Sequence, residues 1–331
     1  MKNIFCLLVF LFPLCLHAQQ TAPKPLYRDP VYDGAADPVV IWNAKEKKWF
    51  MFYTNRRASD ANAKGVSWCH GTRIGIAESV NGRNWTYRDT ANINYRPDSG
   101  YTFWAPEVTE HNGTYHMYLT YVPGIFNDWG HPRNIVHLTS SDLLNWHYQS
   151  VLKLSSNKVL DACVSRLPDG NWRMWYNDEP TGKSIFYADS PDLYNWTDKG
   201  KAISDQRGEG PKVFYWKGRY RMIVDNWAGM SIYSSSDMVN WTRQPNRILE
   251  EPGTGAEDAA IGGHADVLVN EGRAYVFYFI HPGRTKTNGA ANDSFNSRRT
   301  LIQLTELEVK DGIITCDRNK PVQINLKKPK S

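Results

Sequence analysis

The sequence has few cysteines, little net charge and only one long apolar run in its 331 residues. Cys6 and Cys15 lie within the first 18 residues, and the remaining Cys69, Cys163 and Cys316 are widely spaced and odd in number. This pattern predicts neither a disulfide framework nor a zinc site. The formal net charge is only +5 and the basic residues form no long cluster, so no nucleic-acid partner is expected.

The single long apolar run lies at the N-terminus. Lys2 is followed by apolar residues 4–16 and then by Leu16-His17-Ala18, which is typical of a cleaved signal peptide covering residues 1–18. The run is too short for a confident membrane span, and no later segment approaches ~20 apolar residues. We therefore expect a protein without membrane insertion that is secreted or periplasmic. Residues 19–26 and the tail 321–331 read as flexible ends.

The chain contains an internal repeat. The pair Asn-Trp recurs at Trp85, Trp146, Trp196 and Trp241, each time after a turn rich in polar residues, and the spacings match the length of a four-stranded propeller blade. Such a regular position favours a packing role for the tryptophan between blades.

Each repeat also contains short apolar and aromatic runs that are separated by turn signals such as Asn112-Gly113 and Lys217-Gly218. Helical periodicity is nearly absent. The sequence therefore predicts an all-β protein, a five-bladed β-propeller that forms a single domain over residues 27–320.

The first strand of every propeller blade lines the central axis, so equivalent residues of these strands converge. Aligning the blades on a shared valine places Asp37, Asp161 and His264 at one position, together with Ala105, and Glu209 falls there with an offset of one residue. Clustered acids are a way to separate carboxyl pKa values in a site. A structural network of polar groups with water or an ion is the alternative for any single member.

Three long connections are expected on the same face as the acids. They cover residues 54–73, 122–134 and 281–300 and bring several arginines and tryptophans to the rim. Aromatic side chains such as Trp104 and Trp129 suit the faces of sugar rings, although a core role for either is an equal alternative. Acidic residues at the axis, surrounded by connections of unequal length, favour a pocket that binds the end of a chain-like ligand.

At these residues the sequence resembles glycoside hydrolase family 43. The resemblance rests on the ordered openings of the five blades, Ala36-Asp37-Pro38, Trp104-Ala105-Pro106-Glu107, Leu160-Asp161, Glu209-Gly210-Pro211 and Gly263-His264. It implies that Asp37 is the general base, Glu209 the general acid and Asp161 the residue that tunes and orients the acid. It further implies a substrate contact for Arg298 and an axial role for His264, facing water or a structural calcium ion. No other cofactor is expected.

A second, more local resemblance is to family 117, whose propellers remove anhydro-galactose from agar fragments. It covers residues 103–122, but Glu209 stands where that family has a Gly-His acid site, and residues 19–36 are too short for its dimerising arm. The oligomeric state is left open.

The family resemblance implies hydrolysis of glycosidic bonds. Asp37 and Glu209 start strands three blades apart, which predicts the wider carboxyl separation of inverting enzymes, roughly 6.5–9.5 Å. The favoured activity is exo-acting release of β-D-xylose or α-L-arabinofuranose from plant or algal oligosaccharides or polysaccharides. The alternatives are an anhydro-galactosidase and a sugar-binding propeller without catalysis. Because the rim is basic, a sulfated or uronate-bearing chain is a further alternative for the substrate, although solvated surface charge explains the rim equally well.

Overall fold

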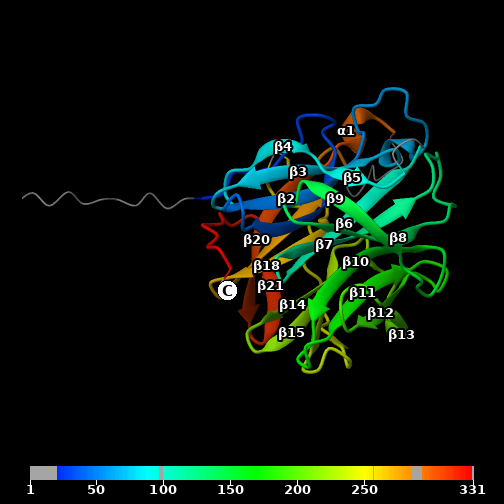
Figure 1. The fold of residues 1–331 in the computed structure, drawn as a ribbon. Helices are drawn as coiled ribbons and strands as arrows, with labels where there is room; N and C mark the ends of the chain where they lie inside the picture. Colours follow the sequence, from blue (N-terminus) through cyan, green and yellow to red (C-terminus); the bar gives the residue numbers. More distant parts are fainter. Residues whose placement is uncertain (1–20, 97–99, 256, 285–292, 330–331) are drawn as a thin grey trace, which may run out of the picture.

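The strands form five antiparallel sheets that are arranged around one axis (Figure 1), so the predicted five-bladed, all-β propeller is confirmed. The computed structural model describes residues 21–96, 100–255, 257–284 and 293–329, so the predicted signal peptide lies outside the described residues. Four sheets have four strands, and the second sheet gains a fifth, β5, which runs parallel to β9.

The strands are named by blade. Blade 1 contains β1 (Ala35–Asn43), β2 (Lys48–Asn55), β3 (Arg73–Ser79) and β4 (Thr86–Thr90). Blade 2 contains β5 (Asn92–Asn94), β6 (Thr102–His111), β7 (Thr114–Val122), β8 (Asn134–Ser140) and β9 (Asn145–Val151). Blade 3 contains β10 (Val159–Arg166), β11 (Trp172–Asp178), β12 (Ser184–Ser190) and β13 (Thr197–Ile203). Blade 4 contains β14 (Glu209–Trp216), β15 (Arg219–Asp225), β16 (Met230–Ser235) and β17 (Thr242–Arg243). Blade 5 contains β18 (Gly263–Asn270), β19 (Arg273–Ile280), β20 (Leu301–Lys310) and β21 (Ile313–Cys316).

The helical segments of the described chain are short and lie in the long connections. They are the 3-10 turn η1 (Ser67–Cys69) and the single turn α1 (Phe295–Arg298). The hairpins between first and second strands use residues that accept positive φ, such as Asn112 at 51° and Gly113 at 79°. This pair suits the tight turn that twisted antiparallel strands require.

The repeated tryptophans pack between blades, as the repeat predicted. Each indole contacts an aromatic ring on the second strand of the preceding blade, with ring centroids 5.4–6.3 Å apart. Such edge-to-face contacts add stability beyond the burial of area. The four pairs are Trp85 with Phe277, Trp146 with Phe52, Trp196 with Tyr118, and Trp241 with Trp175.

The centre of the axis is filled by side chains from the five first strands, which contact one another in a closed ring. Lys212 Nζ lies 2.9 Å from both Glu107 Oε2 and Asp266 Oδ1, and all three side chains are largely buried. Glu107 also accepts the Val164 backbone N–H, and Asp266 accepts that of Val40. Because a buried ion needs a partner and hydrogen bonds, this triad and its two backbone hydrogen bonds tie all five blades together at the axis.

Both ends of the described chain pack where blade 5 meets blade 1, so residues 21–26 and 322–326 correct the expectation of flexible ends. Thr21 pairs with Gln323, and the Leu326 N–H binds the Asn81 carbonyl of blade 1. Ala22 and Leu26 are buried in the same apolar cluster as the tail. In Figure 1 the blue start and the red end lie on one side of the molecule. These segments carry no periodic signal in the sequence because each end contributes only isolated apolar residues.

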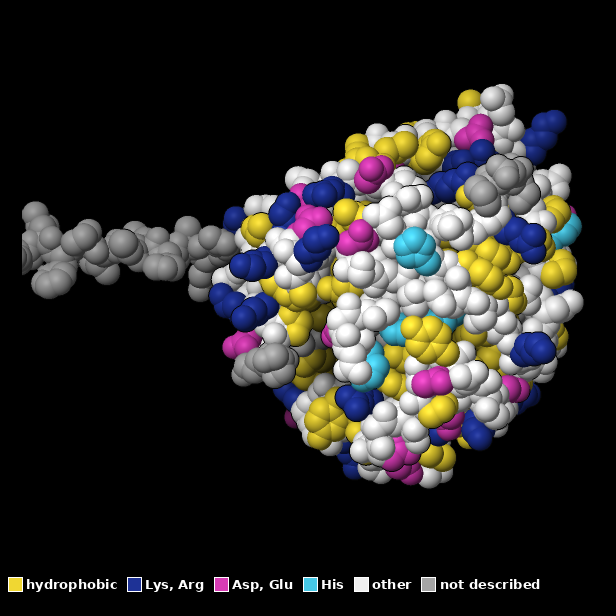
Figure 2. All heavy atoms as spheres, viewed as in Figure 1, with side chains coloured by type: hydrophobic (Ala, Val, Ile, Leu, Met, Phe, Trp, Pro, Cys, Tyr) yellow, Lys and Arg dark blue, Asp and Glu magenta, His cyan; other side chains and the backbone are white. Residues whose placement is uncertain are grey.

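Charges of both signs are interspersed on the face shown in Figure 2, and hydrophobic side chains lie among them in small groups. Within the described ranges, no helix has the length and apolar character needed to cross a membrane.

Two histidines are buried side by side between β7 and β8. His116 Nδ1 lies 3.0 Å from His137 Nε2, and the rings stack at 5.2 Å. Burial lowers the pKa of His116 to about 4 and that of His137 to about 3. The unfolded chain, with a pKa near 6.5 for each, binds more protons below that pH than the folded chain does. The stability that these neutral rings contribute is therefore present above pH 6.5 and is lost as the pH falls towards 4.

We predict that replacing both histidines by Phe flattens the acid side of the stability profile. The wild-type protein should lose roughly 2–4 kcal/mol more than the His116→Phe/His137→Phe variant between pH 7 and pH 5. Chemical denaturation at several pH values measures this slope, whatever the absolute stability of the variant. His147→Gln, at an exposed position on β9, is the control and should keep the wild-type slope. Equal slopes for all three proteins would refute the assignment.

Candidate active site

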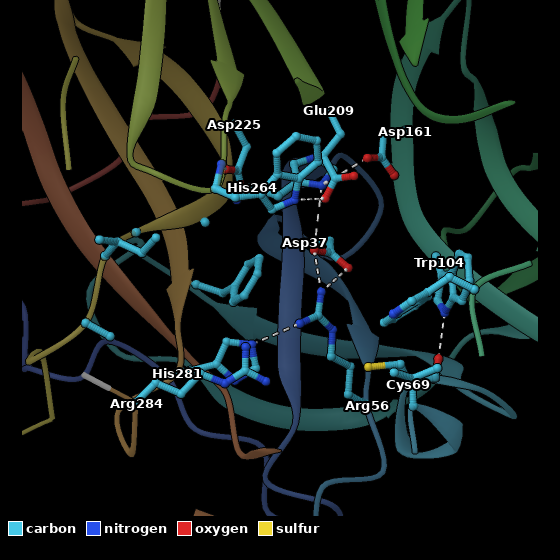
Figure 3. A pocket seen from close by; sticks show the side chains of 18 of the residues that line it. Asp37, Arg56, Cys69, Trp104, Asp161, Glu209, Asp225, His264, His281 and Arg284 are labelled. Carbon is cyan, nitrogen blue, oxygen red and sulfur yellow. Dashed lines mark hydrogen bonds and ion pairs between the residues drawn. The ribbon is translucent and has the colours of Figure 1, made fainter. Parts of the chain in front are cut away.

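A cavity of about 1230 Å³ opens at the end of the axis where the first strands begin. Asp37, Asp161, Glu209 and His264, the four polar residues expected to converge, all line it (Figure 3). The long connections after β2, β7 and β19 form part of its wall, as their position in the repeat predicted.

Each first strand breaks its pairing with the second strand beside the cavity. A bulge falls at the cavity end of all five, for example between Ala36 and Val39 in β1. Asp37, Ala105 and Asp161 occupy it with φ values of 52°, 42° and 58°. Positive φ is uncommon outside glycine, and asparagine or aspartate tolerates it best. The bulge thus turns the aspartate side chains from the sheet into the cavity.

The bulge also explains the one-residue offset of Glu209. In blade 4 the bulge position is Gly210, with φ 56°. A Cβ there would lie 2.6 Å from the ring of His264, so no larger residue fits. The preceding residue, Glu209, therefore supplies the carboxyl group of this blade.

Polar side chains on the second strands hold the bulges in place. Thr54 Oγ1 accepts the Ala105 N–H at 2.8 Å, and Thr120 Oγ1 accepts the Asp161 N–H at 3.1 Å. In the same way Asp225 Oδ2 accepts the His264 N–H at 2.7 Å. Each of these three bulges is thus fixed by the blade before it.

Asp37 lies between an arginine and a histidine. Arg56 Nη2 donates to both carboxylate oxygens of Asp37, at 3.2 and 3.4 Å. His264 Nδ1 lies 3.6 Å from Asp37 Oδ1 and 3.9 Å from Asp161 Oδ2. The imidazole therefore separates the first two aspartates of the site.

Glu209 has a different set of partners. Trp227 Nε1 donates to Glu209 Oε1 at 3.0 Å, and Lys183 Nζ lies 3.6 Å from Oε2. Its side chain keeps 24% exposure, which is more than Asp37 or Asp161 retains. Glu209 is thus the carboxyl group of the three that is most open to the cavity.

Asp225 is a fourth carboxyl group of the site and was not predicted. It ends β15, is buried, and accepts the backbone N–H groups of Trp227 and His264. Comparison of the second strands at the position of Thr54 and Thr120 would have indicated it, because only blade 4 has an acid there.

Two carboxyl groups of the site, those of Asp161 and Asp225, have pKa values above their usual range. Burial, together with the charges of Glu209 and Asp37, raises the pKa of Asp161 well above its ordinary value. Burial and the charge of Glu209 raise the pKa of Asp225 to about 7. Negative charges confined in a poorly hydrated cavity oppose further ionisation. The cluster can therefore retain a proton near neutral pH and share it among interacting groups.

Trp104 and Trp129, predicted as sugar platforms, both line the cavity. Trp104 is 8% exposed and its indole N–H binds the Cys69 carbonyl, so it forms a fixed wall. Trp129 is 51% exposed, and its ring centroid lies 5.9 Å from that of Trp104. Together they form an aromatic corner on the blade 2 side.

Arg298, for which the family resemblance implied a substrate contact, lines the cavity but is engaged by the protein. Its Nε donates to Asp293 at 2.6 Å, and its two other nitrogens bind the carbonyls of Asp60 and Ala63. The side chain is 7% exposed. It joins the connections of blades 1 and 5, and the arginine beside the predicted base is instead Arg56.

The donors around His264 do not suit calcium, which prefers six to eight oxygen ligands. Within the described ranges no group of three or more potential ligands could hold a metal ion. The imidazole contacts two carboxylates directly, and the buried Lys212 ammonium already neutralises the acids deeper on the axis.

Comparison with solved structures shows which proteins share this architecture. A thermostable family-43 glycoside hydrolase is 19% identical, with a TM-score of 0.66 over 92% of this chain and 99% of its own. The chain shares this five-bladed fold. A family-43 β-1,3-galactosidase with galactodeoxynojirimycin gives 15% identity and a TM-score of 0.64, over 89% of this chain and 97% of its own.

A third similar structure comes from a compost microbial metagenome. This β-xylosidase/α-arabinofuranosidase, in a calcium-free complex with xylotriose, is 15% identical, with a TM-score of 0.61 over 85% of this chain and 93% of its own. Neither a protein-family model nor a curated protein matches the sequence.

We predict that Asp161→Asn stabilises the protein at alkaline pH. A carboxyl group whose pKa is raised by folding contributes stability that is present below its pKa in the unfolded chain, near 3.9. This stability is lost as the pH rises through its pKa in the folded protein. The neutral amide should therefore raise the Tm relative to wild type by about 2–5 °C at pH 8 and by less at pH 5.

Scanning calorimetry at both pH values measures this difference. Asp311→Asn, in an exposed turn, removes the same charge and should leave the Tm unchanged at both. A lower Tm for Asp161→Asn at pH 8 would contradict the assignment of Asp161 to a repulsive carboxyl cluster.

Proposed function

We propose that the protein is an exo-acting, inverting glycoside hydrolase that is secreted or periplasmic. The observation that carries the proposal is the meeting of Asp37, Asp161 and Glu209 in one cavity, although 172 positions separate the outer two in the chain. The similar structures include a β-1,3-galactosidase and a β-xylosidase/α-arabinofuranosidase, which supports carbohydrate as the substrate class.

In the proposed reaction Glu209 is the general acid and Asp37 the general base. Glu209 gives its proton to the glycosidic oxygen as the bond to the anomeric carbon breaks. Asp37 takes a proton from a water molecule whose oxygen bonds to the same carbon from the opposite face. The separate partners of the two groups, Arg56 and His264 for Asp37 and Trp227 and Lys183 for Glu209, suit two different roles.

Asp161 acts as a positioning group. Its Oδ2 accepts the Gly210 N–H at 3.1 Å, next to the acid in the chain. It lies near His264, and burial together with the charges of Glu209 and Asp37 raises its pKa. It can therefore set the charge balance between acid and base without touching the scissile bond.

The favoured substrates are oligosaccharides or polysaccharides of plant or algal origin with terminal β-D-xylose or α-L-arabinofuranose. An algal galactan fragment with a terminal anhydro-galactose is the alternative. A sugar-binding propeller without catalysis would need the aromatic corner of Trp104 and Trp129 but not a set of desolvated carboxyl groups. Because burying such groups is costly, their retention favours the enzyme.

We predict that Asp37→Asn and Glu209→Gln each abolish turnover. Removing a general acid or base costs about 10²–10⁴ in rate, and an inverting enzyme needs both groups in one step. Release of monosaccharide from a panel of plant and algal oligosaccharides identifies a substrate, and kcat on it is then compared between variants. Asp161→Asn should keep a trace of activity.

Glu271→Gln, in the exposed turn between β18 and β19, is the control and should keep wild-type kcat. Circular dichroism and Tm should show intact folding for every variant. Near-wild-type activity in either Asp37→Asn or Glu209→Gln would refute the roles assigned here. Binding of glycans by wild-type protein without hydrolysis would favour the sugar-binding alternative.

We also predict inversion at the anomeric centre. One displacement by water reverses the configuration, whereas a covalent intermediate would retain it. Proton NMR recorded in the first minutes of hydrolysis shows which anomer is released before mutarotation. An initial product with the configuration of the substrate would contradict the inverting mechanism and would point to Asp37 as a nucleophile.

A further inference from the structure

Three carboxyl groups of the cavity lie on one side of it, and two arginines lie on the other. Asp161, Glu209 and Asp225 lie together on the side of blades 3 and 4, whereas Arg56 and Arg284 lie on the side of blades 5 and 1, with Asp37 between the two groups (Figure 3). A sugar chain bound at Asp37 and Glu209 therefore meets a basic wall as well as an acidic one.

Most cations of this cavity have a carboxylate partner within ion-pair distance. Arg133 and Lys183 pair with Glu179, Arg298 pairs with Asp293, and Arg56 pairs with Asp37. These side chains are neutralised by the protein itself.

Arg284 differs because none of the described carboxylates pairs with it. Its Nε donates to the Ser297 carbonyl at 2.8 Å, and its guanidinium lies 5.9 Å from the ring of Trp68. Residues 285–292, which follow it, contain no Asp or Glu, so the adjoining sequence supplies no acidic partner. Arg207 is also unpaired within the described part of the chain, but it is exposed to solvent.

The surroundings of Arg284 make the missing partner significant. Burial and the charge of Arg56 lower the pKa of Arg284 to about 10, because both disfavour the charged form of its guanidinium group. His281, which contacts Arg56 at 3.4 Å, is kept neutral because burial lowers its pKa well below the ordinary value. Two guanidinium groups therefore face this part of the cavity without a compensating anion for the second.

We propose that Arg284, supported by Arg56, binds an anionic substituent of the substrate, a carboxylate or a sulfate ester on a sugar next to the scissile bond. A guanidinium matches the geometry of either group and can bind it through two parallel hydrogen bonds. This inference rests on the proposed glycosidase function and names the substrate class for it. The acidic side, with Asp161, Glu209 and Asp225, repels such a group, so the chain can bind in only one orientation.

The first test compares substrates that differ only in the anion. The 4-nitrophenyl β-D-xyloside and β-D-glucuronide differ in the carboxylate on C5, and uronate-substituted xylo-oligosaccharides are compared with unsubstituted ones. Sulfated galactan oligosaccharides and their desulfated forms are the second pair, which distinguishes sulfate from carboxylate. The anionic member of one pair should have a kcat/KM at least about 10-fold higher, as expected for a charge-assisted hydrogen-bond pair.

The second test uses Arg284→Gln on the favoured pair. It should lower kcat/KM on the anionic substrate about 10- to 100-fold and leave the neutral substrate unchanged. Arg284→Lys should restore part of the loss, because it keeps the charge without the planar fork. Arg219→Gln, an exposed arginine at the start of β15, removes the same charge and should change neither value.

The outcomes separate this inference from the proposed function. The inference is overturned if the neutral members are hydrolysed at equal or higher kcat/KM. It is also overturned if Arg284→Gln lowers kcat/KM equally on both members. In either case the protein is still a glycosidase. If nothing is hydrolysed, calorimetric titration with the same oligosaccharides decides. Tighter binding of an anionic member that Arg284→Gln abolishes supports the inference without catalysis, and equal binding of both members overturns it.

Discussion

The cavity depends on a backbone constraint, the bulge that interrupts every first strand beside the axis. Where an aspartate or alanine occupies it, φ lies between 42° and 58°, a conformation that costs about 1–3 kcal/mol per residue. At two of these bulges the cost is offset because the N–H finds an acceptor on the preceding blade, Thr54 for Ala105 and Thr120 for Asp161. The blades therefore position one another's polar side chains, and the site exists only in the closed ring.

The closed ring in turn depends on packing that repeats from blade to blade. Trp146 against Phe52 and Trp241 against Trp175 set the distance between neighbouring sheets. The strongly buried side chains of these contacts leave little freedom for a blade to shift. Rigid blades are the condition under which two carboxyl groups can keep different partners across a cavity, and such preorganisation is what electrostatic catalysis requires.

Much of the fold and of the site could be predicted from the repeat, because residues that recur at one blade position lie at equivalent places around the axis. The valine register located Asp37, Asp161 and His264, and the offset of Glu209 follows from Gly210, which the sequence also contains. Asp225 was missed because the valine register compares the first strands only, and its contact with the N–H of His264 in another blade appears only in the folded structure. Arg284 belongs to the connection 281–300 that was expected at the rim, but its lack of a carboxylate partner is a property of the folded structure and could not be predicted. The packed ends, such as Leu26 and Leu326, carry no periodic signal.

The form of the cavity bears on how a substrate enters. Below the bulges the axis is filled by Val39, Glu107, Cys163, Lys212 and Asp266, which follow the bulges of the five first strands. The triad of Lys212 with its two acids resists opening, because parting it would leave unpaired charges in the interior. The passage is therefore blind, and a sugar that reaches Asp37 cannot continue along the axis. A cavity that ends at the filled axis admits the end of a chain more readily than its middle, and this supports the proposed release of terminal sugars.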